Sequence, residues 1–417
     1  MKKMAFLFPG QGSQYVGMGK KFYDNFKVAR ELFEEANDIL GFDIKDLCFN
    51  GSLDLLTKTE NTQPALLTVS VAGFKVYMEE IGLEPICLMG HSLGEISALV
   101  CAGGIKFSDA IRIVRCRGEF MQAAVPGGMG AMAAISGITS EYINEECKRF
   151  GSENVVVSNY NSSDQTVISG HKEYVDKFSD LLNQAGGRVI PLNVSAPFHS
   201  PFMKLAADRL KGELNKYTYY PMKYPVISNV DSLPYQDHNC IVENLSKQVV
   251  MPVQWVSCMN YLQGHKMDIA IEMGPGEVLK KLILRNVNGI DAFSYDNQTD
   301  TDKLKNLVNK PICDKESKLK LMERCLAIAV CTPNCNWNSE EYSQGVIEPF
   351  KRIQQKVYHL EREGSDPSLE QMEQALDMLR LIFVTKGTPV DEQNERFNQI
   401  FNETGTRDLF KGFKMPC

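Results

Sequence analysis

A serine between two glycines is the residue of this chain whose surroundings point most directly to chemistry. The run from Gly90 to Gly94 reads G-H-S-L-G, the spacing of a nucleophile elbow. Glycines two residues before and after the serine remove side chains that a tight, strained turn cannot hold. The turn lifts the hydroxyl clear of the sheet and places it near a helix N-terminus, where backbone N–H groups can bind an oxyanion. We therefore predict that Ser92 is a nucleophile, with an ordinary loop serine as the alternative.

A serine nucleophile needs a base, and histidine is the usual one near neutral pH. The chain has six histidines. His91 adjoins the serine, but neighbouring side chains at an elbow diverge, and His171 falls in a separate segment. His199 lies in the loop-like stretch Ser195–Ser200. We predict His199 as the base, and a surface loop histidine is the alternative interpretation.

The segments that would position these residues alternate between strands and helices over about the first 290 residues, which favours an α/β fold. Strands are expected over 4–8, 85–89, 131–135, 154–159 and 166–169, and a helix over 63–80. The strand over 85–89 ends just before the glycine-flanked serine, and a helical pattern follows it. A nucleophile elbow requires this order of strand, turn and helix.

Changes in pattern divide the chain into five parts. A Gly-rich joint at 126–130 precedes a stretch of short strands, and a segment rich in Asn and Asp precedes the purely helical end. The predicted parts are a first large-domain segment over 1–127, a small α+β subdomain over 128–196, a second large-domain segment over 197–290, a linker over 291–310 and a helical extension over 311–417. In the extension, Asp366 with Pro367 and Asn338 with Glu341 predict helix starts, and Gly387 predicts a stop.

Charge and composition exclude several classes of protein. The 417 residues carry a net charge of −7 and 43% hydrophobic residues, which argues against a nucleic-acid-binding protein and for an ordinary globular chain. No apolar run approaches the ~20 residues of a membrane span. The first residues resemble the opening of a signal peptide, but Pro9 and Gly10 cut the apolar stretch short. We expect no nucleic-acid partner and no membrane partner.

The twelve cysteines follow no disulfide spacing and fall mostly in apolar runs. Buried free thiols in a reducing, cytoplasmic protein explain them most simply. Cys325, Cys331 and Cys335 lie close together in the sequence, but no Cys-x-x-Cys pair or nearby histidine completes a zinc site. We expect no metal.

Five motifs, taken together, resemble those of the malonyl-CoA:acyl carrier protein transacylases. In chain order they read F-P-G-Q-G-S-Q from Phe8, G-H-S-L-G-E from Gly90, R-G-E-F-M-Q from Arg117, F-H-S from Phe198 and E-M-G-P-G from Glu272. The resemblance covers roughly residues 1–290. Five motifs in order at matching separations are much more specific than any one of them alone.

This resemblance implies a Ser–His dyad of Ser92 and His199. In that family a backbone carbonyl, rather than an aspartate, holds the histidine. The resemblance implies that Gln248 lies near that carbonyl. An ordinary amide at a helix end remains the alternative for Gln248. The resemblance also implies that the backbone N–H groups of Gln11 and Leu93 form the oxyanion hole.

The resemblance also implies that Arg117 selects the substrate. From spacing alone the arginines at 112, 115 and 117 are a solvated helix face, and only the R-G-x-x-M-Q match singles out Arg117. A buried guanidinium can hold the free carboxylate of a malonyl group by two parallel hydrogen bonds. The same family pattern places Met121, Phe198 and His91 in or beside the substrate pocket. A Phe at 198 resembles malonyl-selective members, whereas Ser is usual there in members that accept a methyl branch.

The resemblance implies an α/β-hydrolase-like large domain with an inserted ferredoxin-like subdomain, followed here by the helical extension. It implies an S-malonyltransferase that forms an acyl-serine ester from malonyl-CoA. The phosphopantetheine thiol of an acyl carrier protein then attacks the ester. Coenzyme A thioester is a substrate in this scheme, and no tightly bound cofactor is required.

The helical extension exceeds what a minimal transacylase needs. It resembles the free-standing, trans-acting acyltransferases that load polyketide or hybrid polyketide–peptide assembly lines. A housekeeping transacylase of fatty-acid synthesis is the alternative pathway. Two further alternatives are a hydrolase that clears stalled carrier proteins and a non-catalytic docking protein.

Overall fold

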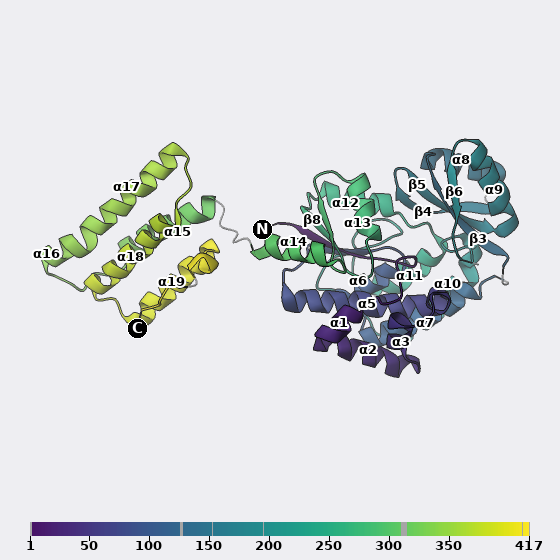
Figure 1. Ribbon diagram of the computed structural model, residues 1–417, viewed down its shortest axis with the longest axis horizontal. Coiled ribbons are helices and arrows are strands. Elements are labelled where there is room, and N and C mark those ends of the chain that lie inside the picture. The colour runs from purple at the N-terminus through teal and green to yellow at the C-terminus, as the bar shows by residue number, and fades with distance from the viewer. Residues whose placement is uncertain are drawn as a thin grey trace. The chain divides into compact units, whose positions relative to one another are not determined.

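The computed structural model describes residues 2–125, 128–151, 153–194, 196–309, 315–410 and 412–416. Residues 126 and 127 of the Gly-rich joint and the predicted start of the extension at 311 lie outside these ranges. The chain forms two compact units, one over 2–304 and one from Lys305 onward (Figure 1). None of the helices in the described ranges combines the length and the apolar character that crossing a bilayer requires.

A five-stranded parallel sheet is the base of the larger unit. Its spatial order is β7 (Val226–Ile227), β2 (Cys87–Gly90), β1 (Met4–Phe8), β8 (Ile269–Glu272) and β9 (Asp291–Ser294). Every residue of β1 is buried, as expected of a parallel strand that is covered on both faces. The α/β architecture predicted from the alternating pattern is confirmed.

Helices cover both faces of this sheet. On one face, Ala5 and Leu7 of β1 pack in a core with α12 (Trp255–Gly264) and α13 (Val278–Asn286). On the other face, Phe6 contacts the rings of Phe74 and Tyr77 in α5. The helices α5 (Thr59–Glu80) and α6 (Leu93–Cys101) cover this second face. Further helices of the unit are α1 (Lys20–Asn25), α2 (Lys27–Leu40), α3 (Ile44–Phe49), α4 (Leu53–Thr57), α7 (Phe107–Gln122), α10 (Lys204–Leu214) and α11 (Ile241–Val250), with short 3₁₀ turns over Pro201–Met203 and His238–Cys240.

A separate antiparallel sheet interrupts the larger unit. Its spatial order is β4 (Val155–Ser162), β5 (Gln165–His171), β3 (Gly130–Ser136) and β6 (Arg188–Pro191). Two helices, α8 (Ser140–Phe150) and α9 (Lys172–Gln184), pack on the same face of this sheet and share its core (Figure 1). The chain order is therefore strand, helix, strand, strand, helix, strand.

The predicted linker over 291–310 is wrong for its described part. Residues Asp291–Ser294 form β9, which pairs in parallel with β8, and α14 (Gln298–Asn309) follows. Ala292 and Phe293 are buried in this edge strand. The polar residues that indicated a linker instead serve as hydrogen-bonding partners of the sheet and of the neighbouring helices.

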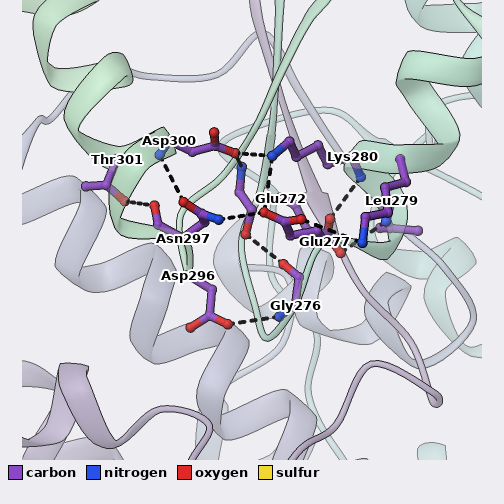
Figure 2. A network of polar contacts seen from close by, with 11 residues as sticks. Glu272, Gly276, Glu277, Leu279, Lys280, Asp296, Asn297, Asp300 and Thr301 are labelled. Carbon is purple, nitrogen blue, oxygen red and sulfur yellow. Dashed lines mark hydrogen bonds and ion pairs between the residues drawn. The ribbon is translucent and has the colours of Figure 1, made fainter.

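Figure 2 shows these polar residues as one network. The carboxylate of Glu272, at the end of β8, accepts hydrogen bonds from the N–H groups of Leu279 and Lys280 at 3.1 and 2.9 Å. The ammonium group of Lys280 lies 2.5 Å from a carboxylate oxygen of Asp300 in α14. The first turn of α13 is thereby fixed to the end of the sheet, because orphan N–H groups at a helix start need acceptors.

The second unit is helical and has a core of its own. Its helices are α15 (Lys315–Cys331), α16 (Ser339–Tyr342), a π-helical turn over Ser343–Ile347, α17 (Glu348–Glu363), α18 (Leu369–Lys386), α19 (Val390–Thr404) and a 3₁₀ turn over Arg407–Phe410. The core contains Leu321, Leu376, Phe383 and Phe397.

Two of the three predicted helix boundaries in this unit are confirmed. Asn338 caps α16, and Gly387 ends α18 in the left-handed conformation. The start predicted at Asp366 is wrong, because Ser368 caps α18 and forms a capping box with Gln371. Pro367 therefore precedes the cap and is not the first helical residue.

We expect Phe383→Ala to destabilise the helical unit by about 3–5 kcal/mol, because it leaves a cavity in the core of that unit. Hydrogen exchange followed by mass spectrometry would show faster exchange in peptides of 315–410 and no change in 2–304. The exposed neighbour Val384→Ala is the matched control. Equal acceleration in both units would contradict two separate cores.

Candidate active site

The turn that carries Ser92 has the geometry of a nucleophile elbow. It joins the end of β2 to the start of α6, and Ser92 adopts φ 53° in the left-handed region. A Cβ atom at Gly90 would lie 1.9 Å from the carbonyl carbon of Gly94, and one at Gly94 would lie 1.9 Å from the carbonyl oxygen of Phe8. Only glycine fits at either position, since both clashes are with backbone. The turn thus holds Ser92 strained and close to the sheet.

The structure brings Ser92 and His199 together. Ser92 Oγ lies 2.7 Å from His199 Nε2, and His199 Nδ1 lies 2.8 Å from the carbonyl oxygen of Gln248. A carbonyl only accepts, so Nδ1 carries the proton and Nε2 is left to accept the proton of the serine hydroxyl. Burial, with a further contribution from the nearby Arg117 cation, lowers the pKa of His199 to about 3. The imidazole is therefore neutral, as a base must be before it acts.

Arg117 reaches the same serine oxygen from α7. Its side chain is buried, and Nη2 donates to Ser92 Oγ at 3.1 Å and to Gln248 Oε1 at 2.8 Å. Nη1 donates to Gln63 Oε1 at 2.9 Å. Burial lowers the pKa of Arg117 to about 10, while Glu95 opposes the shift, so the guanidinium keeps its charge near neutrality.

Two amide side chains hold the elbow from outside. The amide oxygen of Asn229 accepts from Ser92 N at 2.7 Å, and its nitrogen donates to the carbonyl of Gly90 at 2.7 Å. The amide nitrogen of Gln248 donates to the carbonyl of Ser92 at 3.0 Å. Asn229 and Gln248 thereby add to the few backbone hydrogen bonds of the turn and hold it from outside.

Glu95 ties these two amides together from the first turn of α6. One carboxylate oxygen accepts from Gln248 Nε2 at 2.7 Å and from the N–H of Asn229 at 3.0 Å. The other accepts from the Tyr235 hydroxyl at 2.5 Å. Burial raises the pKa of Glu95 to about 7, although its hydrogen bonds and the charge of Arg117 oppose the shift.

A cavity of about 290 Å³ opens above Ser92, between the parallel sheet and the antiparallel sheet. Its lining includes eight of the nine candidate residues, namely Gln11, His91, Ser92, Leu93, Arg117, Met121, Phe198 and His199. Gln248 lies behind them and does not line it. Within the described part of the chain, the N–H groups of Gln11 and Leu93 have no hydrogen-bond acceptor, so both are free to bind an oxyanion.

The other two candidate histidines have different surroundings. His91 Nε2 lies 2.9 Å from Asn161 Oδ1, and its ring packs near Trp255. His171 lies at the end of β5, with its ring 4.7 Å from that of Phe202. Neither lies at hydrogen-bond distance from Ser92 Oγ, so the geometry leaves His199 as the residue placed to act as its base.

Sequence reasoning missed Gln63, Glu95, Asn229 and Tyr235 as parts of this site. Glu95 carried a signal, because it is the one charged residue in the mostly apolar helix α6. A buried charge of that kind needs a partner nearby. The other three carried none, since an amide or a tyrosine outside a recognisable motif has many structural uses.

The fold and site define an α/β protein with a serine–histidine pair and a buried arginine, an arrangement suited to acyl transfer. Comparison with known proteins gives the family, since the family described as "Acyl transferase domain" matches residues 5–295. The chain therefore belongs to the acyl transferase domain family.

Relatives are similar over different lengths. A malonyl CoA-acyl carrier protein transacylase of Bacillus subtilis is 39% identical over 395 residues, covering 94% of this chain and 99% of its own length. The protein of the same name from Escherichia coli K12 is 45% identical over 295 residues, covering 70% of this chain and 95% of its own length.

Solved structures agree with this assignment. A type II PKS acyl-carrier protein in complex with its malonyl-transacylase matches with a TM-score of 0.71 and 41% identity, over 73% of this chain and 99% of that one. The malonyl CoA-acyl carrier protein transacylase of Coxiella burnetii matches with a TM-score of 0.72 and 38% identity, over 74% of this chain and 98% of that one.

Gly94→Ala should destabilise the larger unit by about 3 kcal/mol or more, because the new methyl group meets the backbone of β1 and cannot be relieved by a rotamer change. Urea unfolding of the variant would measure the loss. Gly212→Ala in α10 is the matched control, since its Cβ meets nothing within 4 Å and should be neutral or slightly stabilising. Equal stability of the two variants would contradict the packing of the elbow.

Proposed function

We propose that this protein transfers a malonyl group from malonyl-CoA to the phosphopantetheine thiol of an acyl carrier protein through an ester on Ser92. One observation carries the proposal: the Ser92 hydroxyl is contacted both by a neutral histidine and by a buried arginine, at the wall of a cavity. The first is suited to acyl transfer and the second to an acyl group with a free carboxylate. The names of the relatives support the same reaction.

The chemistry follows from the positions of these groups. His199 Nε2 takes the proton of Ser92 as the oxygen attacks the thioester carbonyl, and the N–H groups of Gln11 and Leu93 bind the resulting oxyanion. Collapse of the intermediate breaks the carbon–sulfur bond, and His199 returns the proton to the leaving thiolate of coenzyme A. The carrier thiol reverses these steps and frees Ser92. The reaction as proposed needs no metal and no tightly bound cofactor.

The donors of Arg117 explain how acylation and carboxylate binding are linked. A two-bond grip on a carboxylate uses Nη2 together with either Nη1 or Nε, because the guanidinium donors are fixed in forks. Both hydrogens of Nη2 are already given to Ser92 Oγ and Gln248 Oε1. We propose that the bond to Ser92 is released when its oxygen becomes an ester, a weaker acceptor, and that the freed hydrogen then binds the malonyl carboxylate.

The fold supports a finer description. We infer that the larger unit is α/β-hydrolase-like, because the nucleophile follows a parallel strand on a glycine-flanked turn at a helix start. We infer that the antiparallel insertion is ferredoxin-like from its strand–helix–strand–strand–helix–strand order. Together these two parts enclose the cavity above Ser92.

We further propose that the protein acts in trans on a polyketide or hybrid polyketide–peptide assembly line. The helical unit supports this pathway, since the relatives that match over about 290 residues lack it. Two transacylases of Bacillus subtilis illustrate the difference: one matches 395 residues of this chain, and one from strain 168 matches 286. A second, longer protein in one species points to a second task. Housekeeping fatty-acid synthesis is the alternative, favoured by the shared name of the shorter relatives.

Arg117→Ala should lower kcat/KM for malonyl-CoA about a hundredfold, because the buried partner of the substrate carboxylate is lost. The kcat/KM for acetyl-CoA should hold steady or rise, because a stranded cation no longer faces a neutral acyl group. Carrier-protein transfer assays with both thioesters measure the ratio. Arg115→Ala, on the same helix but bonded to Glu119, is the control and should leave the ratio unchanged. An unchanged ratio in Arg117→Ala would rule out the arginine as the selector.

A chain that ends at Asn309 tests the pathway. The candidate site residues all lie upstream, so acylation by malonyl-CoA and transfer to a fatty-acid carrier should persist. Transfer to a polyketide-type carrier, measured as kcat/KM for each carrier, should fall relative to the full chain. If the full chain serves both carriers equally and truncation changes neither rate, the fatty-acid pathway is the better assignment.

A further inference from the structure

We propose that Glu95 is the internal counter-ion of Arg117 and a positioning residue that acts through Gln248, setting how strongly the site prefers an acyl group with a carboxylate. This inference rests on the proposed function, in which Arg117 binds the substrate carboxylate. Glu95 touches neither the cavity nor the reacting atoms, so it can act only through its neighbours.

A single amide connects the two buried charges. Arg117 Nη2 donates to Gln248 Oε1 at 2.8 Å, and Gln248 Nε2 donates to Glu95 Oε2 at 2.7 Å. The cation and the anion are therefore joined in one hydrogen-bonded line, with the amide oriented so that each end meets the charge it prefers. Both charged side chains are buried, so solvent screens their attraction only weakly.

The remaining contacts of Glu95 hold its position. The Tyr235 hydroxyl and the N–H of Asn229 complete the shell of its carboxylate. Asn229 and Gln248 in turn bond the backbone of Ser92, so the same carboxylate supports the elbow and compensates the arginine. A residue with a purely structural role would support the elbow but would not compensate the charge of Arg117.

The charge of Glu95 has opposite consequences for two kinds of substrate. A malonyl carboxylate at Arg117 would share one cation with Glu95, which weakens the grip on malonyl. A neutral acyl group leaves Arg117 without a substrate anion, and Glu95 then lowers the penalty of that buried charge. Removing the charge should therefore favour malonyl and disfavour acetyl.

The test is the ratio of kcat/KM for malonyl-CoA to that for acetyl-CoA in Glu95→Gln, which keeps the shape of the side chain and removes its charge. We expect the ratio to rise about tenfold, through a lower KM for malonyl-CoA and a lower kcat/KM for acetyl-CoA. In the background of Arg117→Ala, the same substitution should leave the ratio unchanged, because the coupled charge is absent.

Two control variants separate charge from structure. Glu272→Gln alters another buried carboxylate, one that caps α13 beside the cavity and bonds no residue of the Arg117–Gln248 line. The two rates should fall by the same factor, so the ratio should not change. Tyr235→Phe removes a hydrogen bond that holds the pKa of Glu95 down. Tm should therefore fall, and the change of the ratio with pH should move to higher pH, whereas a purely structural role of Glu95 would lower Tm alone.

The wild-type protein gives a second test that does not depend on the folding of a variant. Burial raises the pKa of Glu95 to about 7, so its charge is largely lost as the pH falls from 8 to 6. The neighbouring pKa values stay outside this window: about 10 for Arg117, about 12 for Cys258, about 3 for His199, and well above 10 for Tyr235. Asp231 acts on Tyr235 and Cys258, and burial lowers the pKa of His91, which lines the cavity, below its ordinary value. The malonyl-to-acetyl ratio should therefore be higher at pH 6 than at pH 8.

The outcomes distinguish the inference from the function on which it rests. A proportional loss for both thioesters in Glu95→Gln, or a wild-type ratio that does not change between pH 6 and pH 8, would overturn the counter-ion role. If the ratio also fails to change in Arg117→Ala, the proposed carboxylate selector is wrong. If only Arg117→Ala changes it, the selector stands and the inference on Glu95 fails.

Discussion

One buried cation determines how this site is built. Arg117 has almost no contact with solvent, so its charge must be met by hydrogen-bond acceptors inside the protein. The acceptors come from distant parts of the chain: Gln63 from α5, Ser92 from the turn after β2, and Gln248 from α11. Because the donors of a guanidinium are fixed in direction, these three elements can approach one another in few ways. As a result, Ser92 Oγ lies between its base, His199, and Arg117, which would bind the substrate carboxylate.

The two sheets position the elbow and form walls of the cavity around Ser92 and Arg117. The parallel sheet ends at the elbow, and glycines let the turn approach β1 closely. The antiparallel sheet contributes Met132, Asn161 and Gln165 to the opposite wall of the cavity. The network that caps α13 fixes the position of Leu279 and Leu282 in a third wall (Figure 2). Residues far from Ser92 thus shape the cavity without touching the reacting atoms.

The fold was predictable where a residue pattern has one physical solution. The short apolar run Met4–Phe8 is cut off by Pro9 and Gly10, which favours a buried strand. The glycines on either side of Ser92 have a steric reason, because side chains there would meet the backbone. The prediction failed at 291–310, because Asn and Asp are common both in linkers and in buried capping networks. Local composition does not distinguish these uses, since the partners of Asp300 lie at Lys280 and Ser294. The helix start at Ser368 was missed for a related reason, as Asp366 is an equally good capping residue by type.

The candidate site was predictable where motifs named residues, and its supporting shell was not. The structure brings Ser92, His199 and Arg117 together, and it identifies the carbonyl that holds the histidine as that of Gln248 itself. Asn229 and Tyr235 lie outside every motif and act through hydrogen bonds to residues far away in the sequence, which leave no periodic or spacing signal. Long-range pairing of this kind becomes visible only when the fold brings the segments together.

The central claim is that Ser92 carries the acyl group. Intact-mass measurement of the full chain after addition of malonyl-CoA, without carrier protein, tests it most directly. We expect one malonyl adduct on the wild type, its loss when an acyl carrier protein is added, and no adduct on Ser92→Ala. A malonyl adduct that persists on Ser92→Ala, or a wild-type protein that forms none, would contradict it.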